Sequence, residues 1–109
     1  MARAISRGEI WMYRFKPPDK RRPVLVLTRQ QVIGLLHWTM VAPITSTIHG
    51  VPSEVVIGVA EGLKQQCAIN LDNVQSVERS RLTTYVGSLD AVQMQAVCRA
   101  LAIAVGCAD

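Results

Sequence analysis

The sequence predicts a mainly β domain, a small antiparallel barrel or curled sheet with one helix packed on it at the C-terminal end. Short segments with strand-type patterns, bounded by turn residues, follow one another up to Leu89. After Leu89 the apolar residues recur at helical spacing. The chain has 109 residues, of which half are hydrophobic, so we expect one domain over 1–109 with a substantial core.

Two segments near the N-terminus have the pattern of paired strands. Residues 7–15, "RGEIWMYRF", alternate and are rich in aromatic residues, which favours a strand. "KPPDKR" then reads as a turn or short loop. Residues 23–29, "PVLVLTR", begin with apolar residues on both faces, which indicates a central strand. We expect Pro23 at its first position, where no ladder N–H is needed.

Further segments with β-type patterns follow an ambiguous connection at 30–37. They are 38–45, 53–59, 67–79 and 84–89. We expect Pro43 to break the first of them and Asp72-Asn73 to bend the third.

The C-terminal segment predicts an amphipathic helix with defined ends. Asp90 is a suitable N-cap, and Gln93 at the third helical position completes a capping box. Leu89 and Met94 are spaced for a hydrophobic staple, and Gly106 is placed to end the helix.

The basic residues are concentrated near the N-terminus. Residues 1–29 hold eight of the twelve Lys and Arg against two acids, a net charge of +6, whereas the remaining residues sum to −2. A basic pole on a small domain favours a polyanion partner, with nucleic acid as the first candidate, and a merely solvated basic surface stays open as the alternative.

Several other classes find no support. No apolar run reaches the ~18–20 residues of a membrane span, and "MARAISRGEI" lacks the apolar core of a signal peptide. We therefore expect a soluble, cytoplasmic protein that does not meet a membrane. No metal, nucleotide or hydrolase motif is present, and we expect no metal and no cofactor. His37 and His49 are expected in loops, and the cysteines are expected as free thiols.

Polar groups at strand ends are the remaining candidates for chemistry. Arg22 begins one strand, and Thr45 ends another. If antiparallel pairing brings them together, a guanidinium beside hydroxyls would form a phosphate-sized pocket. An arginine flanking a strand edge and hydroxyls that satisfy turn backbone explain the same pattern without a site.

Four segments together resemble the MazF/PemK/Kid family of toxin–antitoxin endoribonucleases. They are "RGEIWMYRF", "RRPVLVLT", "VAPITST" and "AINLDNVQSVERSRL". They occur in the family's order and at compatible spacing, and the resemblance extends over residues 7 to about 105. It implies an SH3-like barrel of the MazF/CcdB-like toxin fold with a C-terminal helix, assembled as a homodimer.

The resemblance also implies an activity and partners. Members cleave single-stranded RNA at short sequences without a metal, through attack of the RNA's own 2′-hydroxyl, and leave a cyclic phosphate and a 5′-hydroxyl. An antitoxin protein that blocks the RNA groove is implied as well. The expected location is the cytoplasm.

The family's catalytic residues fall on Arg22 and Thr45 of this sequence, and a carboxylate that some members use as a base falls on Asp72. The expected RNA-binding residues are Lys20, Arg21, Ser46, Asp72, Asn73 and Gln75. The chain departs from the members that use the carboxylate. They have an arginine where this chain has Asn70, and their histidine in the first loop has no counterpart here.

Two readings from other classes remain. Toxins that bind DNA gyrase resemble this family in fold, and a basic barrel can bind RNA without cutting it. Neither needs a pocket shared by Arg22 and Thr45.

Overall fold

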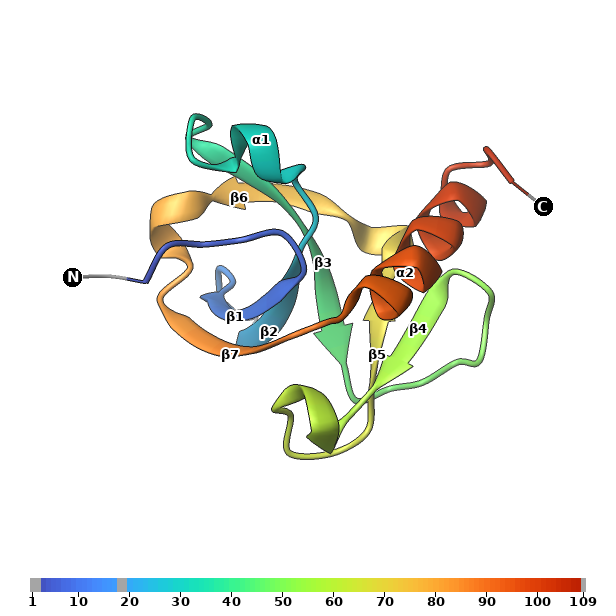
Figure 1. Cartoon of the computed structure of the whole chain (residues 1–109). Coiled ribbons are helices and arrows are strands. Elements are labelled where there is room, and N and C mark those ends of the chain that lie inside the picture. The colour runs from blue at the N-terminus through green and yellow to red at the C-terminus, as the bar shows by residue number, and fades with distance from the viewer. Residues whose placement is uncertain (1–2, 18–19, 109) are drawn as a thin grey trace.

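The structure is a computed structural model that describes residues 3–17 and 20–108. Antiparallel strands form a curled sheet, and a C-terminal helix packs against one side of it (Figure 1). The strands are β1 (Glu9–Arg14), β2 (Arg21–Val26), β3 (Trp38–Thr45), β4 (Glu54–Ile57), β5 (Cys67–Asn70), β6 (Gln75–Glu78) and β7 (Thr84–Ser88). The helices are α1 (Gln30–Ile33) and α2 (Ala91–Ala104), with short 3-10 turns η1 (Val59–Glu61), η2 (Leu71–Asn73) and η3 (Arg79–Arg81). The predicted fold class is confirmed.

The sheet is ordered β4-β5-β3-β2-β1-β7, and β6 pairs with β3 beside this path. One edge of β3 is paired with β2. The other edge is divided, because its first half pairs with β6 and its last two residues pair with β5. The turn η2 joins β5 to β6 and therefore lies against the middle of β3.

Alternation along the strands gives the sheet two apolar faces. Ile10, Leu25 and Ile44 belong to the core on the side covered by α2, which contributes Val97 and Ala100. The neighbouring positions on the strands form a second cluster on the other face. Its members are Trp11, Tyr13, Val24, Val26, Ile33, Val41, Val77 and Leu82.

Close backbone packing joins the two ends of the sheet. The turn η1, which follows β4, packs against β7. A Cβ at Gly87 would overlap the carbonyl oxygen of Glu61, and Gly62 has a φ of 96° beside Val86. Only glycine permits this approach, which helps to curl the sheet toward a barrel.

The helix α2 has the predicted ends. Asp90 Oδ1 accepts a hydrogen bond from the Gln93 N–H at 2.8 Å, and Gln93 Oε1 accepts one from the Asp90 N–H at 2.9 Å. Gly106 adopts a φ of 79° after the last turn, as a C-terminal glycine does. No helix within residues 3–17 and 20–108 has the length and apolarity needed to cross a membrane.

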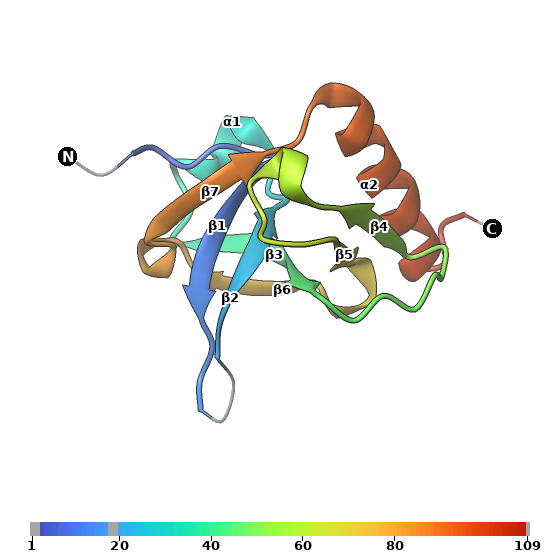
Figure 2. The same ribbon diagram turned by 90° about the horizontal axis from the view of Figure 1, so that it is seen from below.

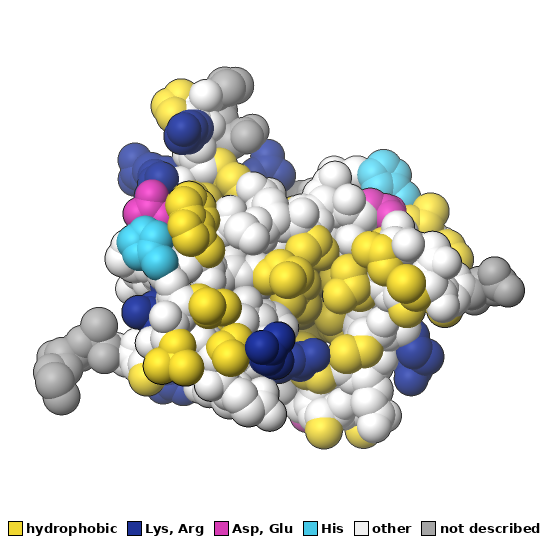
Figure 3. All heavy atoms as spheres, turned by 90° about the horizontal axis from the view of Figure 1, so that it is seen from above, with side chains coloured by type: hydrophobic (Ala, Val, Ile, Leu, Met, Phe, Trp, Pro, Cys, Tyr) yellow, Lys and Arg dark blue, Asp and Glu magenta, His cyan; other side chains and the backbone are white. Residues whose placement is uncertain are grey.

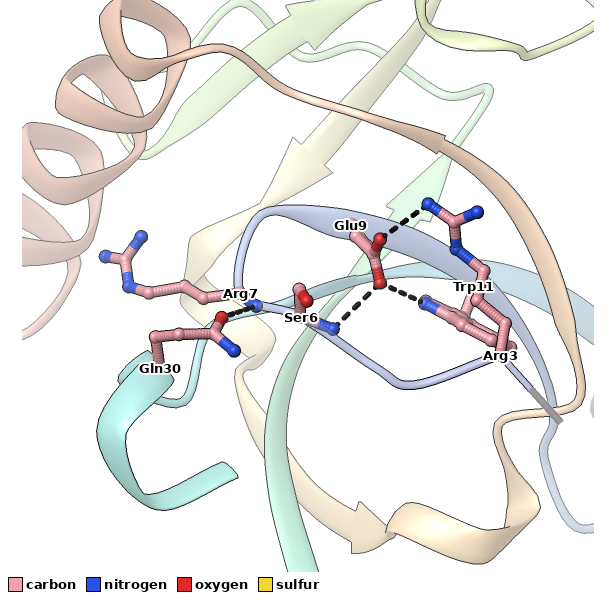
Figure 4. Close-up of polar contacts among 6 residues, drawn as sticks. All are labelled: Arg3, Ser6, Arg7, Glu9, Trp11 and Gln30. Atoms are coloured by element: carbon pink, nitrogen blue, oxygen red, sulfur yellow. Dashed lines mark hydrogen bonds and ion pairs between the residues drawn. The ribbon is translucent and has the colours of Figure 1, made fainter. Parts of the chain in front are cut away.

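The segment before β1 is tied down by the buried carboxylate of Glu9 (Figure 4). Its Oε1 accepts hydrogen bonds from the backbone N–H of Ser6 at 2.8 Å and from Nε1 of Trp11 at 3.1 Å. The N–H of Arg7 donates to Oε1 of Gln30 at the start of α1. The motif "RGE" therefore has a structural function here.

Two predictions about proline were wrong. The strand β3 runs through Pro43 without a break, because pairing with β6 stops at Val41 and pairing with β5 resumes at Ile44, so no ladder donor is required between them. Pro23 is the third residue of β2, which begins at Arg21, and it lies opposite Met12.

Candidate active site

A shallow groove of about 540 Å³ lies on the surface where β2, β3 and η2 meet. Its lining is Phe15, Arg22, Pro43, Asp72, Asn73, Val74 and Gln75, and we call it the Arg22 groove. Four of the predicted site residues, Arg22, Asp72, Asn73 and Gln75, therefore share one surface although they are up to 53 positions apart in the sequence.

The sheet register explains this grouping. Val24 lies opposite Pro43 in the β2–β3 pair, and Val41 lies opposite Gln75 in the β3–β6 pair. Side chains two residues apart on a strand point to the same face, so Arg22 continues the face of Val24. It meets the turn η2 across β3, with Pro43 between them.

Asp72 is held by neighbours on both sides. Its backbone N–H donates to Asn70 Oδ1 at 2.9 Å, which caps the turn η2. Its Oδ2 accepts a hydrogen bond from the hydroxyl of the buried residue Ser53 at 2.5 Å. Because Ser53 engages one carboxylate oxygen, the other is the one available to a ligand in the groove.

Thr45 does not line the groove. Continuing the β2–β3 register two residues past Val24–Pro43 sets Thr45 opposite Arg22, and both would then be on the face that carries Pro43. The Thr45 hydroxyl oxygen accepts the N–H of Thr47 at 3.1 Å. Ser46 is exposed immediately after β3.

The other two predicted cations lie elsewhere. Lys20 is exposed just before β2 and does not line the groove. Arg21 precedes Arg22 on the same strand and therefore points to the opposite face. Its guanidinium donates to Thr84 Oγ1 at 2.5 Å.

Ser53, which holds Asp72, and Phe15, which lines the groove, are not among the predicted site residues. Ser53 occurs in the turn "HGVPS", where a serine is expected to satisfy local backbone, so no sequence signal points to its bond with Asp72. Phe15 ends the predicted strand 7–15, and it contacts Tyr13 edge to face with ring centroids 4.9 Å apart.

The histidines and cysteines lie outside the groove. His37 Nε2 is 3.7 Å from a carboxylate oxygen of Glu78, and the backbone N–H of His49 donates to Glu54 Oε1. Within the part of the chain that the structure describes, no three His, Cys, Asp or Glu side chains are grouped as metal ligands would be. The cysteines are free thiols.

A different surface of the molecule is apolar. Figure 3 shows hydrophobic side chains gathered around a hollow on the side that carries α1, β6 and α2. We call it the apolar face, and its apolar lining includes Val32, Leu36, Trp38, Met40 and Leu101. Trp38 is 53% exposed and Met40 is 44% exposed.

Known proteins resemble the chain over almost its whole length. Residues 6–105 match the family of PemK-like, MazF-like toxins of type II toxin–antitoxin systems. The chain is 41% identical over 103 residues to "Probable endoribonuclease MazF5" of Mycobacterium tuberculosis, which is 94% of each sequence. It is 40% identical over 83 residues to "Endoribonuclease MazF3" of the same organism, with 76% of this chain and 81% of that protein covered.

Solved structures also resemble the chain over most of its length. The "Mycobacterium tuberculosis toxin MazF-mt6" superposes with a TM-score of 0.84 at 36% identity, over 93% of this chain and 98% of that one. A further structure, "Crystal structure of Mtb toxin", has a TM-score of 0.75 at 34% identity and covers 88% of this chain and 98% of the other. The chain therefore belongs to the PemK-like, MazF-like toxins of type II toxin–antitoxin systems.

Proposed function

We propose that this toxin is a cytoplasmic endoribonuclease that cuts single-stranded RNA at short sequences in the Arg22 groove, without a metal ion. Two relatives at about 40% identity carry the name endoribonuclease. The observation that carries the site assignment is that Arg22 and Asp72 line one groove. A cation and a carboxylate on one surface are the groups that phosphodiester transfer needs.

The reaction is an internal transfer within the RNA. The 2′-hydroxyl oxygen forms a bond to the adjacent phosphorus, and the bond from phosphorus to the 5′-oxygen of the next nucleotide breaks. The 2′-hydroxyl gives up a proton, and the leaving 5′-oxygen takes one up. The products are a 2′,3′-cyclic phosphate and a 5′-hydroxyl, and no water is consumed in this step.

Arg22 carries a positive charge that can stabilise the transition state. Negative charge grows on the phosphorane oxygens, and a guanidinium offers two parallel donors to a pair of such oxygens. The side chain is exposed at the groove wall, so a phosphate can reach it. A fixed donor of this kind contributes roughly 10²–10³ in rate.

Asp72 is the candidate base, and Thr45 is the candidate for orienting the phosphate. The Ser53 hydroxyl fixes the Asp72 carboxylate, which leaves its second oxygen to accept the 2′-hydroxyl proton. A positioned base contributes about 10²–10⁴ in rate. Thr45, next to Pro43 on the same strand face, would donate its hydroxyl hydrogen to a nonbridging oxygen. Asn73 and Gln75 offer amides for reading a base.

The proposal includes a second copy of the chain and an antitoxin. Trp38 and Met40 are large apolar side chains on the apolar face, and leaving them in water is unfavourable. We assign this face to the homodimer contact. We assign the Arg22 groove to competition between RNA and the antitoxin, because a protein that covers Arg22 would exclude a scissile phosphate.

The test is cleavage of a mixed RNA pool by the purified protein, with excess EDTA in one arm and added magnesium in another. We expect equal cleavage in both arms, with cyclic phosphate and 5′-hydroxyl ends on mapping. The variant Arg22→Ala should lose at least ~10²-fold in rate. Its melting temperature should match that of the wild type, because Arg22 is exposed.

Three results would contradict the proposal. Cleavage that stops with EDTA and returns with magnesium would contradict the metal-free mechanism. An Arg22→Ala variant that cuts at close to the wild-type rate would remove Arg22 from the site. Intact RNA with the wild-type protein, together with capture of DNA gyrase, would favour a binding toxin instead.

A further inference from the structure

A second cationic surface lies outside the Arg22 groove. A pocket of about 470 Å³ is lined by Arg14, Arg21, Ser80, Arg81 and Thr83, and we call it the cationic pocket. Its residues come from β1, β2, η3 and the loop before β7. It shares no lining residue with the Arg22 groove.

Two of its arginines repel each other when no ligand is bound. Arg14 and Arg21 are direct partners in the β1–β2 ladder, and like charges directly opposite destabilise a strand pair. Neither of the ion pairs found among the described residues includes Arg14, Arg21 or Arg81. A bound anion would relieve this repulsion.

Local contacts hold two of the side chains in place. The Arg21 guanidinium donates to the Thr84 hydroxyl across β1. The Arg81 guanidinium lies over the Tyr13 ring, 5.4 Å from its centroid. These contacts use few of the donors that a guanidinium carries, so several remain for a ligand. Ser80 and Thr83 add hydroxyls to the same lining.

We infer that the cationic pocket binds a backbone phosphate of the RNA substrate other than the one that is cut. The inference rests on the proposed function, because it takes RNA to be the substrate. Arg21 and Arg22 are consecutive in β2 and point to opposite faces, whereas Arg81 lies over Tyr13, the β1 partner of Arg22. The groove therefore lies at the β3 side of the β1–β2 hairpin and the pocket at its β7 side. This hairpin projects from the body of the molecule (Figure 2).

An RNA strand that reaches both sites must therefore cross the hairpin from its β3 side to its β7 side. The scissile phosphate would lie at Arg22, and a phosphate further along the strand would lie among Arg14, Arg21 and Arg81. Single-stranded RNA is flexible enough for such a path, and arginine matches phosphate oxygens in pairs. The pocket would then hold a long substrate in register without taking part in the bond exchange.

The test compares Arg14→Gln, and Arg14→Gln combined with Arg81→Gln, with the wild type. Arg99→Gln is the matched control, because Arg99 is an exposed arginine of α2 outside both sites. Binding of a 2′-O-methyl RNA, which cannot be cut, is measured between about 0.1 and 1 M salt. This range runs from weak to strong screening of the charges. KM and kcat are measured on an RNA of about a dozen nucleotides and on a dinucleotide.

Each phosphate contact contributes ~0.7 to the slope of log affinity against log salt for a single strand. Loss of one contact should therefore lower the slope by about 0.7. The gain in affinity from 1 M to 0.1 M salt would then be roughly fivefold smaller than for the wild type. We expect KM on the long RNA to rise by a similar factor with kcat within about twofold, since the cut phosphate stays at Arg22. The dinucleotide should show no change, and Arg99→Gln should behave as wild type.

The outcomes separate this inference from the proposed function. If the wild type cuts RNA but the variants keep its salt slope and KM, the pocket does not bind the substrate and the nuclease proposal stands. If the variants impair the dinucleotide as much as the long RNA, the pocket is not a separate site. If the wild type neither cuts nor binds RNA, the proposed function itself fails. Melting temperatures that are not below that of the wild type exclude misfolding as the cause, since Arg14→Gln also removes the repulsion between Arg14 and Arg21.

Discussion

Removing the carboxylate of Glu9 tests how the segment before β1 is held. Glu9 is 7% exposed, and its two oxygens have different partners (Figure 4). Oε1 accepts from the Ser6 N–H and from Trp11 Nε1, whereas Oε2 accepts from Arg3 at 3.2 Å. The substitution Glu9→Ala would leave all three donors without this acceptor.

The largest loss comes from Trp11, which is 3% exposed. An indole N–H left without a partner in the interior costs about 1–3 kcal/mol. The Ser6 N–H is less enclosed and adds less, and the Arg3 side chain is 57% exposed, so its ion pair contributes well under ~1 kcal/mol. We expect Glu9→Ala to lower the free energy of unfolding by about 2–3 kcal/mol, which is about 8–12 °C in melting temperature for a chain of this length.

Glu9→Gln is the matched control. Its amide oxygen can still accept from both Ser6 and Trp11, whereas the charge and the acceptor that face Arg3 are lost. We expect this variant to lose less than about 1 kcal/mol. Urea titration and thermal denaturation followed by circular dichroism measure both. If Glu9→Ala and Glu9→Gln lie within ~0.5 kcal/mol of each other, the bonds to Oε1 do not hold this segment.

The remaining predictions concern the site, the apolar face and the sheet. Asp72→Asn should reduce RNA cleavage by ~10²–10⁴ without changing the melting temperature, and a reduction under about threefold would rule out Asp72 as the base. Trp38→Glu should halve the mass measured by light scattering. Leu35 is 82% exposed and lies outside the apolar face, so Leu35→Glu should leave the mass unchanged. An unchanged mass for both variants would place the dimer contact elsewhere. Gly87→Ala should lower the free energy of unfolding by about 1–3 kcal/mol, because its Cβ would overlap Glu61, whereas Gly34→Ala meets no atom within 4 Å and should be neutral.

The helix α2 could be predicted in detail because its determinants are local. The caps at Asp90 and Gln93 involve residues three apart, and Gly106 ends the helix through its own backbone conformation. Such signals require no knowledge of distant contacts. The strand periodicity was equally informative, because alternation depends only on which residues face an apolar layer.

Pro43 shows where local reasoning failed. A proline inside a strand predicts a break when both edges of the strand are expected to be paired. In this fold the second edge of β3 is shared by β6 and β5, and Pro43 lies between the two ladders. The proline is thus tolerated because of how β5 and β6 pair with β3. That pairing cannot be predicted from residues 38–45 alone.

The site was only partly predictable for a related reason. Sequence placed Lys20, Arg21 and Arg22 together as cations before a buried strand, but neighbours on a strand face opposite ways. Of the two arginines that belong to β2, only Arg22 shares a face with Val24 and so reaches Pro43 and Asp72 across the sheet. Lys20 precedes the strand and does not line the groove. Arg21 is directed by the same alternation to Arg14 and Thr84. A run of like charges at a strand end is therefore divided between two surfaces, and the parity of each residue along the strand decides which surface it reaches.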